Sequence, residues 1–540
     1  MKIERTKNAV RNIVFDGSLK LLNMVIPFIL RSVMLHYLGV QYLGLNGLFR
    51  SILSFLNLAE LGVGSAMVFS MYKPIAEDDA PSICALLKLY RTFYRAIGLF
   101  IAVVGLALTP FLRSLISGDI PADMNLYILY FMNLGSTVLT YWLFAYKRSL
   151  LDAHQRTDVI SKVSLITQFV EYALKLPALI IFKNYYMFLG VQLGAQVVIN
   201  LLTAIQVNKM YPQYTPQGHL PREKVMDIVR RVRDLFTSKF SAVVFNFADT
   251  LVISAFMGLA ALAIYQNYFF VITALRTFID VIIVACIAGV GNSLVTETEE
   301  KNYNDFARIT MLFGWIMGVG SAMLLCLYQP FMEIWMGAEN MLSFDYVICF
   351  VIYFYTMGMN KIVNMFKDAA GIWRKDRLRP LVAALVNLGL NLATVRWLGM
   401  YGVLLSSVVA IVVVEIPWLF HNLFQELFPR RFLGQYVRFF CGLVAVALAS
   451  CAVSWILCSL LRLNVWTTLI VNGCVSFLVP NLFFFVLYGK NSLFRESIAQ
   501  IKRVLLKKKP VFSVQFPYES PKRNRFSLYW ISGCDIIILR

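Results

Sequence analysis

The sequence is poor in charge and in the residue patterns that carry soluble enzyme chemistry. Only 15% of its 540 residues are charged, and its four histidines are scattered along the chain. It has no glycine-rich loop of the Walker type, which argues against an ATPase engine. The nine cysteines show no paired spacing typical of metal ligands, so we interpret them as small core residues. We therefore expect no catalytic site, no metal site and no cofactor.

Apolar residues are abundant, because 59% of the chain is hydrophobic and 42 residues are phenylalanine. A transmembrane helix needs about 20 predominantly apolar residues to cross roughly 30 Å of hydrocarbon. The stretches 309–327 and 439–461 meet this requirement without a single charge. All such stretches together predict an all-α integral membrane protein with about 14 transmembrane helices.

The net charge of +20 is explained by where the basic residues fall. If the N-terminus is cytosolic, most of the 50 Lys and Arg residues lie in cytosolic segments, as the positive-inside rule requires. An even number of helices then places both termini in the cytosol. No basic patch accompanies a soluble aromatic platform, so membrane lipids rather than nucleic acid are the expected partner. The predicted outer loops hold Arg113, Lys183, Arg396 and Arg462.

The two halves of the sequence resemble each other at an offset of about 220 residues. Gly39, after the first predicted helix, corresponds to Gly258 after the seventh, and Glu60 corresponds to Asp280. Because the offset covers an even number of helices, we expect parallel repeats about an axis along the membrane normal, an arrangement common among transporters. Two further matches pair residues 77–79 with 297–300 and residues 151–158 with 367–376.

The repeat predicts the organisation of the chain. Two six-helix lobes are expected, followed by a final helix pair and a basic cytosolic tail. The linker between the lobes contains prolines and then a basic amphipathic stretch, for which we expect a helix on the inner membrane surface or, alternatively, an ordinary cytosolic helix. The predicted segments are the N-lobe 1–208, the linker 209–239, the C-lobe 240–424, the helix pair 425–489 and the tail 490–540.

Ionisable residues inside the predicted helices are the candidate functional residues, because a charge facing lipid is costly and normally faces the protein interior or a wet cavity. Several of them stand four residues apart and can neutralise each other within one helix. Asp16 with Lys20, Arg276 with Asp280 and Glu171 with Lys175 have this spacing. The candidates are Asp16, Lys20, Arg31, Arg50, Glu60, Asp249, Arg276 and Asp280.

Arg31 and Arg50 have no such local partner, and both fall in the outer part of their predicted helices. The guanidinium group stays protonated and matches phosphate oxygens, so we expect both residues, together with Arg276, to bind a pyrophosphate in a cavity. The alternative is that they pair with Glu60 or Asp249 across the interface between the lobes.

The acidic candidates allow a second interpretation, in which Glu60, Asp249 and Asp280 bind a proton or a sodium ion that drives transport. The sequence does not separate ion coupling from pairing within the cavity, and Asp16 and Lys20 share this ambiguity. Glu415 has no local partner, and its role is left open.

The first three predicted helices resemble the Wzx-type lipid-linked oligosaccharide flippases of the MOP superfamily, which also includes the MATE exporters and the lipid II flippases. The similarity extends more weakly to about Gly489, and the tail departs from the family pattern. The motifs that carry the resemblance are Pro27-Phe28-Ile29-Leu30-Arg31, Tyr42-Leu43-Gly44-Leu45-Asn46-Gly47-Leu48-Phe49, Leu56-Asn57-Leu58-Ala59-Glu60-Leu61-Gly62 and Met71-Tyr72-Lys73-Pro74-Ile75-Ala76.

The resemblance implies a flippase that moves undecaprenyl-pyrophosphate-linked oligosaccharide repeat units across a bacterial cytoplasmic membrane for capsule, O-antigen or exopolysaccharide assembly. It also implies polysaccharide polymerase and chain-length proteins as partners. Two alternatives remain. One is a cation-coupled, MATE-like exporter of small molecules, which would favour an acidic, aromatic cavity. The other is a membrane glycosyltransferase or polymerase, which would need a large outer loop bearing carboxylates.

Overall fold

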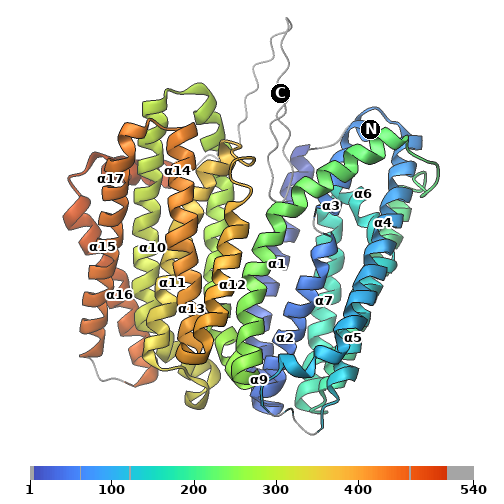
Figure 1. The fold of residues 1–540 in the computed structure, drawn as a ribbon, viewed down its shortest axis with the longest axis horizontal. Coiled ribbons are helices and arrows are strands. Elements are labelled where there is room, and N and C mark those ends of the chain that lie inside the picture. Colours follow the sequence, from blue (N-terminus) through green and yellow to red (C-terminus); the bar gives the residue numbers. More distant parts are fainter. Residues whose placement is uncertain (1–4, 61, 119, 121–122, 461–463, 507–540) are drawn as a thin grey trace, which may run out of the picture. The chain divides into compact units, whose positions relative to one another are not determined.

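The computed structural model describes residues 5–506, apart from residues 61, 119, 121–122 and 461–463. Within these residues every regular element is a helix (Figure 1). The apolar runs fold this way because the bilayer interior offers the backbone no hydrogen-bond partner, so each run must satisfy its own amide groups. The predicted all-α membrane fold is confirmed. Arg462 and most of the predicted basic tail, residues 507–540, lie outside the described part of the chain.

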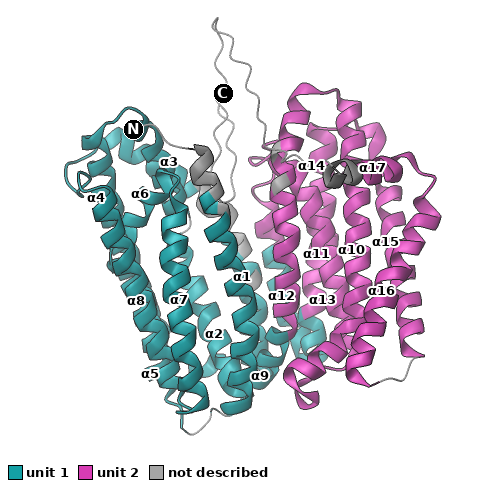
Figure 2. Cartoon of the chain, turned by 180° about the vertical axis from the view of Figure 1, so that it is seen from behind, with its two compact units in different colours: residues 1–267, 384–403 teal, residues 268–383, 404–540 magenta. Residues whose placement is uncertain are grey.

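The chain divides into two compact units, shown in teal and magenta in Figure 2. Unit 1 holds residues 1–267 and 384–403, and it is built mainly from the helices that precede residue 222. Its helices are α1 (Arg5–Tyr37), α2 (Val40–Leu56), α3 (Val63–Ala76), α4 (Ala80–Leu108), α5 (Leu126–Trp142), α6 (Arg148–Ala153), α7 (Thr157–Ile180) and α8 (Tyr185–Met210).

Unit 2 holds residues 268–383 and 404–540. Helices α9, α12 and α13 contribute residues to both units. The later helices are α9 (Arg222–Thr296), α10 (Glu299–Met336), α11 (Phe344–Ala369), α12 (Arg379–Leu398), α13 (Met400–Val409), α14 (Ile416–Glu426), α15 (Leu433–Ser459), α16 (Val465–Tyr488) and α17 (Ser492–Leu506).

Each unit has its own packed interior. In unit 1, α7 packs against both α1 and α8, and the fully buried rings of Phe49 and Tyr130 lie 5.9 Å apart. In unit 2, α10 packs against α11, α15 and α16. Phe306 anchors that contact, because its ring lies 4.6 Å from the ring of Phe366 and 4.4 Å from that of Tyr436. Aromatic rings fill these interiors, where no water is available to solvate polar side chains.

The described helices account for the predicted number of membrane crossings. Eleven of them are long and apolar enough to cross a membrane, and the bent pair 126–142 and 145–153 makes twelve. One of the eleven, Val243–Thr296, has 54 residues and would be about 80 Å long at 1.5 Å per residue, enough for two crossings. The second predicted span is broken into α2, a 3₁₀ turn (Asn57–Glu60) and α3, each too short alone. Counting Val243–Thr296 as two crossings and α2 with α3 as one further crossing gives fourteen.

The predicted internal repeat is visible in the backbone. Gly39 has φ 104° and ψ 172°, and Gly258 has φ 87° and ψ 178°, a conformation that is essentially restricted to glycine. Positive φ also recurs at Gly118 (80°) and Gly337 (83°). Each pair is separated by the offset expected from the sequence, so the halves share their turn geometry as well as their residues.

The ends of α6 and α11 provide a third match. Gln155 and Gly371 both adopt positive φ, 58° and 69°, immediately after these helices. The amide of Arg156 donates a hydrogen bond to the carbonyl of Leu151, five residues earlier, over 2.8 Å. At the matching position of α11, the amide of Ile372 donates to the carbonyl of Lys367 over 3.1 Å. This is the hydrogen-bond pattern of a Schellman helix end. Both segments had been matched from the sequence.

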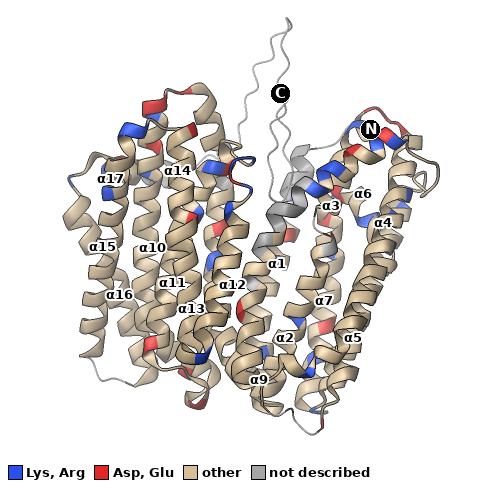
Figure 3. Ribbon diagram, in the orientation of Figure 1, with Lys and Arg blue, Asp and Glu red and all other residues tan. Residues whose placement is uncertain are grey.

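Charged residues concentrate at one end of each unit. In unit 1 they gather where α3, α4 and α6 meet their loops, and in unit 2 around the ends of α14 and α17 (Figure 3). Between these ends and the opposite loops the helices carry few charges, as the cost of a charge in hydrocarbon requires. The chain is a multi-pass membrane protein, and the side on which each end lies stays a prediction.

The predicted linker helix is not a separate element. Helix α9 begins at Arg222 and continues without a non-helical residue as far as Gly258, so the amphipathic stretch and the seventh span are continuous. How this stretch lies against the membrane stays a prediction.

Candidate functional site

The first helices of unit 1 bring the two candidate arginines together. Arg31 on α1 donates a hydrogen bond to the side-chain oxygen of Asn267 over 2.6 Å. Arg50 on α2 is exposed, makes no ion pair with a described residue, and lies close enough for its charge to repel that of Arg31. The amide oxygen of Asn267 orients the Arg31 guanidinium. The arrangement therefore concentrates positive charge inside a membrane bundle.

Lys175 is a neighbour of this arginine pair that the sequence analysis did not include in the site. Its side chain is 5% exposed and forms the predicted ion pair with Glu171 over 2.5 Å. It also donates to Gln192 over 3.0 Å and lies 4.5 Å from the ring centre of Phe188. The charge of Arg50 acts on Lys175. Because Glu171 cancels the charge of Lys175, the net positive charge comes from the two arginines.

The predicted ion pair between Asp16 and Lys20 is wrong for the described structure. Asp16 instead accepts hydrogen bonds from Thr157, over 3.2 Å, and from Ser161, both on α7. Lys20 is exposed and makes no ion pair within the described residues. Helix α1 packs along α7, so hydroxyl groups from the neighbouring helix reach the carboxylate before the flexible lysine does.

Glu60 lies at the break between α2 and α3, where it is held by tyrosines. Its carboxylate accepts hydrogen bonds from Tyr94 and, over 2.8 Å, from Tyr141. Tyr90 in turn donates to Tyr94 over 2.8 Å. The 3₁₀ turn Asn57–Glu60 and Gly62, with φ 88°, interrupt the helix and set the carboxylate among these three rings. Helix α4 supplies two of the tyrosines and α5 the third.

Asp249 on α9 is the most enclosed of the candidate carboxylates, with 7% of its surface exposed. It accepts hydrogen bonds from Asn391 of α12 over 2.7 Å and from Tyr265 over 3.3 Å. Asn391 also donates to Asn387 over 3.0 Å, and its own side-chain oxygen has no hydrogen-bond partner among the described residues. One carboxylate surrounded by amide and hydroxyl oxygens is a donor set that suits a hard cation or a proton.

Arg276 and Asp280 form the predicted pair on α9 within unit 2, with 3.7 Å between the guanidinium and the carboxylate. Asp280 has a second cation, Lys361 of α11, which the sequence analysis had not counted among the charges inside the membrane. Lys361 lies within a helix long and apolar enough to span, and this position was the available signal. Asp280 thus forms ion pairs with two cations, Arg276 and Lys361.

Glu415, whose role the sequence left open, is the last residue of a π-helical segment, Ala410–Glu415. It accepts from Asn360 and forms an ion pair over 3.2 Å with Arg379. Arg379 is 3% exposed and also bonds to Asp376 over 2.7 Å. Two carboxylates thus satisfy one buried arginine in unit 2. The buried charge of Arg379 is thus balanced by carboxylates, and we interpret this cluster as structural.

These clusters offer charged and polar groups that can bind ions. The arginine pair can hold an anion, and the Asp249 cluster can hold a cation or a proton. Within the described residues, no group of three or more His, Cys, Asp or Glu side chains is arranged to hold a metal ion.

Sequence comparison gives no relative, because no protein-family model matches the chain and no curated protein matches it. Solved structures do match. One is the lipid II flippase MurJ in an inward closed conformation, with a TM-score of 0.64 at 12% identity over 88% of this chain and 99% of that one. Another is a multidrug resistance MATE family transporter of the MOP superfamily in an inward-facing conformation, with a TM-score of 0.61 at 15% identity over 74% and 94%.

A third match is a MOP superfamily transporter from Pyrococcus furiosus, described as having a binding pocket of reversed polarity. Its TM-score is 0.53 at 14% identity, and the match covers 78% of this chain and 95% of that one. At these identities the likeness concerns the fold, and it extends over nearly the whole of each matched transporter. The chain therefore has the fold of the MOP superfamily transporters.

Proposed function

We propose that this protein is a flippase that moves an undecaprenyl-pyrophosphate-linked oligosaccharide repeat unit across a bacterial cytoplasmic membrane. The observation that carries the proposal is the pair Arg31 and Arg50, two mutually repelling cations on neighbouring membrane helices. Guanidinium groups bind phosphate oxygens in a bidentate way, so two of them on neighbouring helices suit a pyrophosphate. A pyrophosphate linked to lipid is an anion that must pass through such a bundle.

The proposed mechanism is alternating access. The headgroup enters from the cytosol, the arginines hold the pyrophosphate, and the lipid tail stays in the bilayer. Arg276 is proposed to bind the pyrophosphate as well. Its ion pair with Asp280 would open when the pyrophosphate arrives. The protein's task is charge stabilisation along the path. Polysaccharide polymerase and chain-length proteins are proposed partners at the outer face.

Asp249 is the proposed site of the coupling ion. Its carboxylate and the unpartnered oxygen of Asn391 are buried together, and both can contribute to a sodium or proton site. Glu60 and Asp280 are weaker candidates, because hydroxyl donors hold the first and two cations hold the second. In proteoliposomes, Asp249→Asn should abolish the stimulation of transport by the ion gradient but leave passive exchange within about twofold. Stimulation retained in this variant would contradict the assignment.

The Asp249 cluster also favours a second candidate function, a cation-coupled exporter of small molecules. Such an exporter would use the same carboxylate but would not need paired arginines. The two functions separate in a deletion strain. Loss of a flippase should leave lipid-linked repeat units on the cytosolic face, whereas loss of an exporter should raise the intracellular level of a small solute.

The experiment that tests the proposal combines deletion with complementation. The strain lacking the gene should accumulate lipid-linked repeat units and lose surface polysaccharide, and the wild-type gene should restore it. The double variant Arg31→Ala, Arg50→Ala should restore less than about a tenth of the polysaccharide at an equal membrane level. Arg495→Ala is the matched control, because it removes an exposed arginine from α17. Full restoration by the double variant would contradict the role of the arginines.

A further inference from the structure

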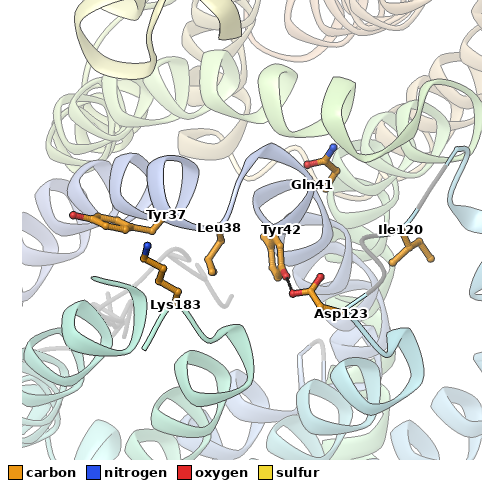
Figure 4. A pocket seen from close by; sticks show the side chains of 7 residues that line it. All are labelled: Tyr37, Leu38, Gln41, Tyr42, Ile120, Asp123 and Lys183. Carbon is orange, nitrogen blue, oxygen red and sulfur yellow. Dashed lines mark hydrogen bonds between the residues drawn. The ribbon is translucent and has the colours of Figure 1, made fainter. Parts of the chain in front are cut away.

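Unit 1 contains a pocket that is distinct from the arginine pair. Its volume is about 500 Å³, within the roughly 300–1,000 Å³ range of small-molecule sites. Three connections converge on it: the turn between α1 and α2, the segment before α5 and the turn between α7 and α8 (Figure 4). All three are predicted outer loops.

Each connection places one kind of side chain at the pocket. The turn at Gly39 ends α1 and begins α2, so it sets Tyr37 and Gln41 on the two sides of the bend. The turn after α7 brings Lys183 to 5.9 Å from the ring centre of Tyr37. On the far side, Tyr42 donates a hydrogen bond to Asp123, which fixes that carboxylate at the rim (Figure 4).

The chemistry of the lining selects a neutral polar ligand. Lys183 and Asp123 contribute one charge of each sign, so the pocket has no net charge to hold a pyrophosphate. Gln41, Asp123 and Lys183 are exposed at the pocket, and a purely apolar ligand would displace water from them without offering hydrogen bonds in return. Hydroxyl groups satisfy all three, because they both donate and accept, and an aromatic ring offers a face to the C–H side of a sugar.

We propose that this pocket binds sugar residues of the translocated oligosaccharide, close to the face where it is released. The proposal rests on the proposed flippase function and on the predicted orientation. It assigns the two parts of the substrate to separate sites: the pyrophosphate to the arginines on α1 and α2, and the neutral sugars to the end of the same bundle. Tyr37 supplies the ring face, and Gln41, Asp123 and Lys183 supply the hydrogen bonds.

The test uses the full chain in proteoliposomes with two probes. One is the polyprenyl-pyrophosphate-linked oligosaccharide extracted from the deletion strain, and the other is polyprenyl pyrophosphate carrying N-acetylglucosamine alone. Tyr37→Ala with Gln41→Ala should slow translocation of the oligosaccharide about fivefold and change that of the single sugar by less than about twofold. Tyr37→Phe keeps the ring and should behave as wild type. Tyr127→Ala, an exposed tyrosine outside the pocket, is the matched control.

The outcomes separate the two proposals. If wild type moves both probes and the pocket variant moves the oligosaccharide at the wild-type rate, the sugar site is overturned while the flippase stands. If the variant slows both probes equally, the sugar site is also overturned. If wild type moves neither probe, both proposals fail. A direct measurement supports the first readout: saturation-transfer NMR with the oligosaccharide freed of lipid should give signals with wild type that are lost in the pocket variant.

Discussion

At the scale of single residues, charges inside the membrane are often held by neutral polar groups. Arg31 bonds to an asparagine, Glu60 to two tyrosines and Asp249 to an asparagine and a tyrosine. Such bonds orient a charge without cancelling it. A site that must attract a charged ligand needs this arrangement, because an ion pair inside the protein would compete with the ligand.

Glu171 and Lys175, in contrast, form an ion pair in which the two charges cancel. Lys175→Gln should lower the free energy of unfolding by about 3 kcal/mol, because it leaves a buried carboxylate without its counter-charge. Translocation should fall as well, since the remaining negative charge lies near Arg50. Adding Glu171→Gln should restore both stability and transport. Unfolding in a denaturing detergent titration and proteoliposome transport measure the two effects. If the double variant folds but does not transport, Lys175 itself binds the transported substrate.

His154 should make the turn after α6 sensitive to acid. Burial lowers the pKa of His154 from its ordinary value of 6.5, and its ring packs 4.4 Å from that of Tyr211. The folded state therefore favours the neutral ring, so its contribution to stability is complete above the unfolded pKa, about 6.5, and is lost as the pH falls below it. The melting temperature of wild type should drop between about pH 7.5 and pH 5.5. His154→Gln should reduce that drop, and an equal drop in both proteins would contradict the assignment.

Residue spacing alone predicted two of the three pairs four residues apart. Arg276 with Asp280 and Glu171 with Lys175 form, because each pair has no better partner within reach on its own helix. Asp16 does not follow the rule, because α7 presents two hydroxyl groups to it. Such partners lie more than a hundred residues away in sequence, and one sequence contains no signal for them. The same reason hid Asn267, the partner of Arg31.

At the scale of elements, the turns at Gly39 and Gly258 provide a matched pair, because their backbone angles are nearly the same. An alanine at either position should cost roughly 1–3 kcal/mol in backbone strain. A Cβ at Gly39 would meet only the side-chain oxygen of Gln41, at 3.6 Å, whereas at Gly258 it would lie 2.7 Å from the carbonyl oxygen of Ser117.

Gly258→Ala should therefore lower the melting temperature more than Gly39→Ala. The carbonyl belongs to the backbone of a turn that is itself bonded to α9, since the amide of Ser117 donates to Ser254 over 3.0 Å. It cannot move without breaking that bond. Gly135→Ala is the control, because a Cβ there meets no atom and the backbone is helical. Equal losses at the two turns would show that steric contact adds nothing to the strain.

The π-helical segment before α14 has a sequence cause. Pro417 follows it by two residues, and proline has no amide hydrogen to donate and its ring crowds the carbonyl four residues earlier. Widening the turn relieves that crowding, and Glu415 at its end then reaches Arg379. Hydropathy predicted an uninterrupted span here, because it does not register backbone hydrogen bonding.

At the scale of the whole molecule, hydropathy and self-similarity predicted the fold class, because membrane helices follow from apolar length and a duplicated half repeats its turns. Hydropathy and self-similarity did not predict the breaks within the helices. The second span is interrupted at Asn57–Glu60, and the linker and the seventh span form one continuous helix as far as Gly258. Both depend on local backbone geometry that a scale of side-chain transfer energies does not contain. Candidate charges and two of their partners on the same helix were predicted, whereas partners on other helices were not.

The central claim is that this chain moves a lipid-linked pyrophosphate across a membrane by means of Arg31 and Arg50. The most direct measurement is translocation of polyprenyl-pyrophosphate-linked oligosaccharide in proteoliposomes containing the purified full chain. Wild type should expose the probe to an enzyme added outside, and Arg31→Ala with Arg50→Ala should slow this at least about tenfold while remaining folded. No translocation by folded wild type, or unchanged translocation by the folded double variant, would contradict the account.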